Sequence, residues 1–146
     1  MDLLEPDPPR RDGRPFGGSL SAPQRLLRRL VTHDVATGES SAYPELRPLD
    51  VSLGVRSAFT AALAAARSMP GWTIVEADEA KGSIRAEART PRLGFVDDVR
   101  VAVKPLADGR SRIHVRSVSR IGVYDFGTNA RRIRAYLDRV DMRTDR

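Results

Sequence analysis

The 146-residue sequence contains no cysteine, which excludes disulfide bonds, thiolate catalysis and cysteine-based zinc sites. It also lacks a long apolar run: the longest are about the length of FTAALAAA, far below the roughly 20 residues that a membrane-spanning helix needs. The first residues, MDLLEPDPPRRDGRP, hold acids and prolines where a secretion signal would hold a basic and then an apolar segment. We therefore expect a cytoplasmic protein without a membrane span, for which peripheral contact with a membrane complex stays open.

Lysine and aromatic residues are also scarce. Aromatic residues make up 5% of the chain, and all but two of its 25 basic residues are arginine, which leaves a net charge of +6. Arginine suits planar contacts with carboxylates and phosphates. No glycine-rich phosphate loop, metal-ligand cluster or paired nucleophile and base can be recognised. We therefore predict no catalytic residue, no cofactor and no metal, and we do not expect an enzyme.

Residues 1–42 form a distinct N-terminal arm, in which the first 19 residues are rich in proline and glycine. Such a composition buries too little apolar surface to offset the entropy of chain ordering, so we expect an extended, partly disordered segment. Within it, SAPQRLLRRLVTHD predicts a short amphipathic helix at about 22–33. The helix either packs on its own domain, docks on a partner protein or rests on an anionic membrane surface, and its apolar face consists of Leu26, Leu27, Leu30 and Val31. A partner protein is favoured over lipid, because the face has no aromatic anchor.

Residues 43–146 form the predicted domain. VRSAFTAALAAARSM (55–69) has helical periodicity and ends at PGW, and GTNARRIRAYLDRVDM (127–142) returns to it, with Thr128 or Asn129 as the expected N-cap. Between them WTIVEAD, GSIRAEART, DDVRVAVKPL and RSRIHVRSVSR alternate with period two, and residues 45–53 could add an edge strand. The order indicates an α+β fold: an antiparallel four- to five-stranded sheet with two helices packed on one face.

The alternation also assigns the two sheet faces. The covered face is predicted to carry Ile84, Ala86, Ala88, Val99, Val101, Val103, Ile113, Val115 and Ser117. The open face is rich in arginine and resembles sheets that bind single-stranded RNA, but it lacks the aromatic side chains on which bases stack. We therefore do not expect a nucleic-acid partner.

The segment SRIGVYDFGTN (119–129) connects the last strand to the last helix, and it gathers the candidate functional residues. Ser117 places a hydroxyl on the covered face, where it needs a hydrogen-bond partner, and Asp125 and Asn129 could provide local bonds. The candidate set is Ser117, Arg120, Asp125, Asn129 and Asp97. These side chains either fix a strand-to-helix corner or line a ligand site. A carboxylate dyad of Asp97 and Asp98 is not expected, since successive strand residues point to opposite faces.

The corner and its neighbouring segments carry a family resemblance. LGFVDDVRVAV and RIHVRSVSRIGVYDFGTNARRIRAYL, together with YPELRPLDV, the alanine-rich helix and MPGWTIVEAD, resemble the bacterial and plant family catalogued as domain of unknown function 1499, over roughly residues 43–140. The matching motif is SRxGxxDFGxNxxRI. The resemblance implies a small α+β domain with no established activity, so it assigns no catalytic residue. Its matched positions are Asp97, Asp98, Ser117, Ser119, Arg120, Gly122, Asp125, Gly127, Asn129 and Arg132.

Two functional hypotheses follow from these observations. The first is a non-enzymatic accessory domain that docks on a larger protein assembly through residues 1–42, because a proline-rich arm with an amphipathic segment precedes a domain without catalytic groups. The alternative is a carrier of a small or lipid-like ligand, with a pocket between helices and sheet that the corner closes.

Overall fold

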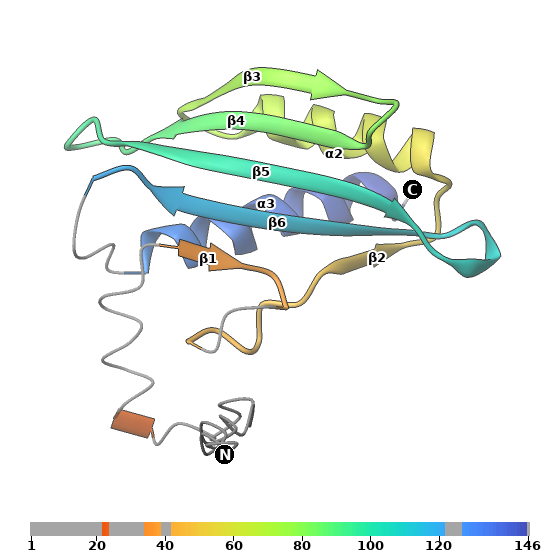
Figure 1. Ribbon diagram of the computed structural model, residues 1–146, viewed down its shortest axis with the longest axis horizontal. Coiled ribbons are helices and arrows are strands. Elements are labelled where there is room, and N and C mark those ends of the chain that lie inside the picture. Colours follow the sequence, from red (N-terminus) through yellow and green to blue (C-terminus); the bar gives the residue numbers. More distant parts are fainter. Residues whose placement is uncertain (1–21, 24–33, 39–41, 122–126, 146) are drawn as a thin grey trace, which may run out of the picture.

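The computed structural model describes residues 22–23, 34–38, 42–121 and 127–145. These residues form one antiparallel sheet of six strands, covered by two helices (Figure 1). The strands are β1 (Asp34–Ala36), β2 (Leu49–Val51), β3 (Trp72–Asp78), β4 (Ser83–Arg89), β5 (Val96–Pro105) and β6 (Ser111–Ser119). The helices are α2 (Val55–Ser68) and α3 (Thr128–Thr144), with a short 3₁₀ turn η1 (Ala107–Gly109) between β5 and β6.

The predicted α+β fold is confirmed, and β3 to β6 form the expected meander. The strand order is β1-β6-β5-β4-β3, and β2 pairs with the same edge of β6 as β1 does. β2 lies inside the predicted edge segment 45–53. β1 was not predicted, because three residues are too few to show alternation. The helix expected at about 22–33 falls mainly on residues 24–33, which lie outside the described residues.

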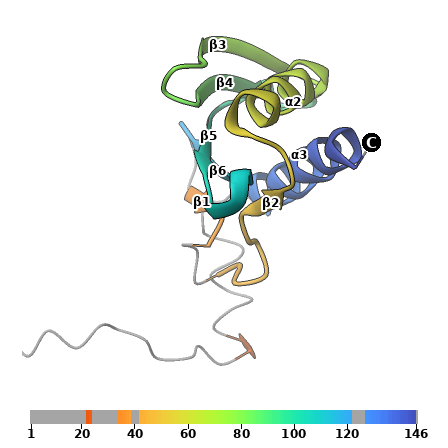
Figure 2. The same ribbon diagram turned by 90° about the vertical axis from the view of Figure 1, so that its right-hand side faces the viewer.

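Both helices pack on the same face of the sheet, as the prediction required (Figures 1 and 2). All nine side chains assigned to the covered face are buried. Ala62, Ala65 and Ala66 of α2 carry nothing beyond Cβ and are fully buried, and α2 and α3 are in contact. Tyr136 of α3 lies in this contact, donates its hydroxyl hydrogen bond to the Ala62 carbonyl oxygen at 2.9 Å, and stacks on Trp72. Burial raises the pKa of Tyr136 well above its ordinary value.

The two edges of the sheet differ. The edge at β6 is covered by β1 and β2, whereas β3 forms the other edge and contains a β-bulge between Ile74 and Glu76. A bulge on an edge strand locally breaks the hydrogen-bond ladder and hinders pairing with another chain. Among the helices described, none is long and apolar enough to cross a membrane.

Candidate functional site

A cluster of polar side chains lies where β5 and β6 meet the start of α3; we call it the corner cluster. It consists of Asp97, Ser117, Ser119, Asn129 and Arg132. Asp97 and Ser117 point toward the helices because each lies two residues from an inward-facing valine on its strand. Asn129 and Arg132 stand one turn apart on α3 and therefore face the same strands.

The hydrogen bonds of the corner cluster form one connected network. The Ser117 hydroxyl donates to Asn129 Oδ1 at 2.6 Å, and Asn129 Nδ2 donates to Ser119 Oγ at 2.9 Å. Arg132 donates through Nη1 to Ser117 Oγ at 3.0 Å and to Asn129 Oδ1 at 2.6 Å, and its Nη2 lies 2.7 Å from Asp97 Oδ2. The side chains of Arg132 and Asp97 are only 9% and 3% exposed, so this is a buried ion pair. A low-dielectric site of this kind is stable only while every charged group keeps its partners.

The start of α3 differs from the sequence prediction. Thr128 or Asn129 was expected to cap the helix, but the N-cap is Gly127, with φ of 77° and no side-chain capping bond. The prediction was wrong because the Asn129 amide is buried and bonds to Ser117 and Ser119 instead. A left-handed φ is the conformation that glycine adopts without steric cost, which explains the glycine at this corner.

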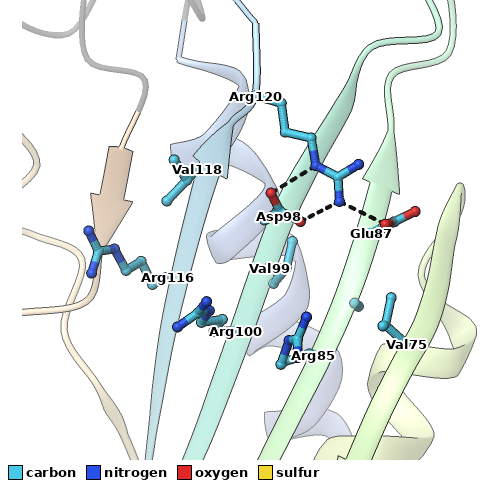
Figure 3. Close-up of a pocket in the computed structure, with 10 residues that line it drawn as sticks. Val75, Arg85, Glu87, Asp98, Val99, Arg100, Arg116, Val118 and Arg120 are labelled. Carbon is cyan, nitrogen blue, oxygen red and sulfur yellow. Dashed lines mark hydrogen bonds and ion pairs between the residues drawn. The ribbon is translucent and has the colours of Figure 1, made fainter.

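The candidate residues do not all gather at one place. Ser117, Asn129 and Asp97 belong to the corner cluster, whereas Asp125 lies outside the described residues. Arg120 points to the open face and donates hydrogen bonds to Asp98 and Glu87 (Figure 3). The hydrogen bonds from Arg120 hold the pKa of Asp98 below its usual range. As expected, Asp97 and Asp98 face opposite sides of the sheet and form no dyad.

An apolar groove of about 640 Å³ adjoins the corner cluster. It lies between the end of α2, the segment that connects β4 to β5, the end of β6 and the first turns of α3. Its large apolar lining side chains are Met69, Trp72, Leu93, Phe95 and Ile121. Leu93 and Ile121 are 71% and 66% exposed, and Phe95 is also exposed. Three exposed large apolar side chains therefore gather around one groove instead of lying scattered over the surface.

The groove also has a basic side. Arg89, Arg92, Arg131 and Arg132 line it, and Asp97 is the single acid among the described lining residues. Asp97 is already engaged by Arg132. Arg92 has no hydrogen-bond or ion-pair partner among the residues that the structure describes. The groove therefore combines apolar walls with uncompensated positive charge, a combination that suits an amphiphile with an anionic head group.

Several residues of the site were not among the sequence candidates. Ser119 and Arg132 were available as matched positions of the family motif, but nothing local indicated that Arg132 would meet Asp97 across 35 positions of sequence. Leu93 and Phe95 lie in the segment between β4 and β5, where exposed apolar residues carry no periodicity that could have marked them. Within the described ranges no cluster of three or more histidine or acidic side chains could hold a metal ion.

Comparison with known proteins places the chain in a family. The model of the family described as protein of unknown function DUF1499 matches residues 21–140, which is most of the chain. Comparison with curated proteins gave no match. The matched range includes the whole sheet, α2 and the part of α3 that carries Asn129 and Arg132.

Proposed function

The chain belongs to the DUF1499 family, and on that premise we propose that its domain binds a small amphiphilic ligand in the apolar groove. The observation that supports this most strongly is the exposed apolar lining beside a set of arginines. The apolar part of the ligand would lie against Leu93, Phe95 and Trp72, and its anionic group would face Arg92 and Arg131. The volume of the groove falls within the range of about 300–1,000 Å³ that small-molecule sites occupy.

The role of the corner cluster in this proposal is to hold the groove in shape. Arg132 and Asp97 contribute to the groove lining, and their side chains are fixed by the network to Ser117 and Asn129. A binding surface with fixed side chains loses less conformational entropy when the ligand arrives. The predicted closure of the pocket by the corner involves residues 122–126, which lie outside the described residues.

The groove offers a direct assay because Trp72, the single tryptophan of the chain, lines it. Dodecanoate is added to the protein below its micellar concentration, and tryptophan emission is followed. We expect a saturable change, and a weaker one with dodecanol, which has the same chain but no charge. Absence of any saturable change with dodecanoate would contradict the proposal.

A matched pair of variants separates groove binding from general surface adsorption. Leu93→Ser removes an exposed side chain in the groove, and Met142→Ser removes one that is 63% exposed on α3 and does not line it. We expect the first variant to weaken dodecanoate binding by about tenfold or more, on the basis of lost apolar contact, and the second to bind as the wild type does. Equal binding by both variants would show that the groove is not the site.

Docking of the N-terminal arm on a protein assembly stays a second proposal. It rests on the apolar pattern of Leu26, Leu27, Leu30 and Val31, which lie outside the described residues. The informative truncation removes residues 1–33 rather than 1–42, because β1 belongs to the sheet. The truncated protein should stay folded and lose a partner that co-purifies with the full chain; retention of that partner would count against docking. The cytoplasmic location expected from the sequence is likewise a proposal, which cell fractionation would test.

A further inference from the structure

The open face of the sheet carries three arginines directly opposite one another on neighbouring strands, which we call the arginine row. In the strand register Arg85 of β4 faces Arg100 of β5, and Arg100 faces Arg116 of β6 (Figure 3). Directly opposed residues have Cβ atoms about 4.5–5.5 Å apart, and like charges at that spacing destabilise a sheet. The three arginines therefore repel one another across the strands, and only anionic groups beside them can offset this repulsion.

The acids of this face do not balance the centre of the row. Arg85 is paired with Glu76 at 3.0 Å, and Arg116 donates to Asp34 from Nε at 2.9 Å. Each acid on or beside the row is engaged by an arginine other than Arg100: Asp34, Glu76, Glu87 and Asp98.

Arg100, in the middle of the row, has no hydrogen-bond or ion-pair partner in the part of the chain that the structure describes. Lys104 lies four residues further along β5 on the same face and also has no such partner among the described residues. It faces Arg112, which is itself bound to Asp50. The central strand therefore presents two cations that form no ion pair among the described residues, both on one side of the sheet.

Two hollows flank the arginine row, with volumes of about 510 and 480 Å³, and all three arginines line both. The first is also lined by Arg120 with its partners Asp98 and Glu87, and the second is lined in addition by Lys81, Lys104 and His114. Neither hollow has a phenylalanine, tyrosine or tryptophan among its described lining residues. Their size suits a small ligand, and they offer no platform on which nucleic-acid bases could stack.

We propose that the arginine row binds a small multivalent oxyanion, carrying phosphate or carboxylate groups, with Arg100 as the central contact. The planar forks of the guanidinium groups match the oxygen geometry of both kinds of group. The ligand would supply the negative charge that the row lacks and relieve the repulsion across the three strands. This site lies on the face of the sheet opposite the groove. The outcome of its test is therefore independent of the proposal that the groove binds an amphiphile.

Calorimetric titration with pyrophosphate and, separately, with citrate tests this proposal at constant ionic strength set with sodium chloride. We expect saturable binding of at least one of them, and the stronger binder identifies the preferred oxyanion. A single-stranded oligonucleotide is the third ligand. Binding of the oligonucleotide without binding of either small anion would overturn the proposal in favour of a nucleic-acid surface, and failure of all three would overturn it as well.

Three variants locate the site. Arg100→Gln should weaken binding of the anion by about tenfold or more. Arg100→Lys keeps the charge but not the planar fork of the guanidinium group, and should weaken binding less. Arg67→Gln removes the same charge from an exposed position on α2, on the other side of the domain, and should leave the affinity within about twofold of the wild type. Equal losses of affinity in Arg100→Gln and Arg67→Gln would show that net charge alone accounts for the effect, and would refute a specific site at the arginine row.

The repulsion in the row provides an independent readout. Without anion, Arg100→Gln should melt about 1–3 °C above the wild type, because it removes opposed like charges. Millimolar pyrophosphate or citrate should raise the melting temperature of the wild type more than that of Arg100→Gln, since the stability gained from a ligand that binds the folded state falls as the affinity falls. Stabilisation of both proteins to the same extent would contradict the assignment of Arg100.

Discussion

Replacement of Asp97 by asparagine tests the central interaction of the corner cluster. The change keeps the size of the side chain and removes the negative charge that faces Arg132 at 2.7 Å. Arg132 would stay buried with two neutral acceptors, Ser117 Oγ and Asn129 Oδ1, and without a counter-ion among the described residues. Loss of one partner from a buried ion pair costs about 3–5 kcal/mol, because the remaining charge stays desolvated.

The two retained hydrogen bonds place the expected cost at the lower end of this range, at about 3 kcal/mol of unfolding free energy. For a chain of this size, that corresponds to a fall in melting temperature of roughly 6–12 °C. Urea unfolding followed by far-ultraviolet circular dichroism measures the free energy directly, and an unchanged dependence on urea concentration would show that the native state is otherwise intact.

The neighbouring residue supplies the control. Asp98→Asn removes a charge one position away on the same strand, but Asp98 is about half exposed and faces Arg120 in solvent. Such surface pairs contribute about 0–1 kcal/mol. The reasoning also predicts that Arg132→Met, introduced into Asp97→Asn, restores part of the lost stability, because it removes the unpaired charge. A cost below about 1 kcal/mol for Asp97→Asn, or strictly additive effects in the double variant, would refute the buried-pair argument.

Three further predictions concern single positions. Gly127→Ala should cost about 1–2 kcal/mol in thermal unfolding, because alanine is strained at φ of 77°, and an unchanged melting temperature would show that the corner relaxes. Tyr136→Phe should cost about 1 kcal/mol, because it removes the hydrogen bond to Ala62; a stability equal to that of the wild type would count against that bond. Asp98→Asn should reduce acid sensitivity: the pKa of Asp98 is lowered by Arg120, so its stabilisation is present above about pH 4 and lost as the pH falls through the folded-state pKa. Melting curves from pH 6 to pH 2 should therefore fall less steeply in that variant than in the wild type.

The main elements of the fold could be predicted because they repeat. Alternation over seven or more residues placed β3 to β6 and their buried valines, and helical periodicity placed α2 and most of α3. β1 could not be predicted in this way, since it has only three residues and pairs with β6, which is far away in the sequence. Its pairing depends on Val35 and Thr37 finding a partner far away in the sequence, which local patterns do not encode.

The candidate site could be predicted only in part, for a related reason. The inward direction of Ser117 followed from strand alternation, and its side chain is buried as expected. Asp97 was a candidate residue without a predicted burial, and the structure shows that it is buried as well. The partners of these side chains could not be derived, because the same Asn129 could serve either as a helix cap or as a buried hydrogen-bond partner. The tertiary contact with Ser117 decides between these roles. The arginine row could not be predicted either, because it depends on the register that places Arg85, Arg100 and Arg116 opposite one another on three strands.

The way in which β1 and β2 cover the edge of β6 has a consequence for the order of folding. Neighbouring strands of the meander meet through short connections, whereas the contact between Asp34 and Arg116 joins residues 82 positions apart. Closing such a long loop costs more entropy, so we expect the meander and its helices to assemble first and β1 to join last. In native-state hydrogen exchange the amide of Thr37, bonded to the Val115 carbonyl oxygen, should then open at a lower free energy than amides between β4 and β5. A force applied through the N-terminal segment would detach β1 from the sheet while the rest of the domain stays folded.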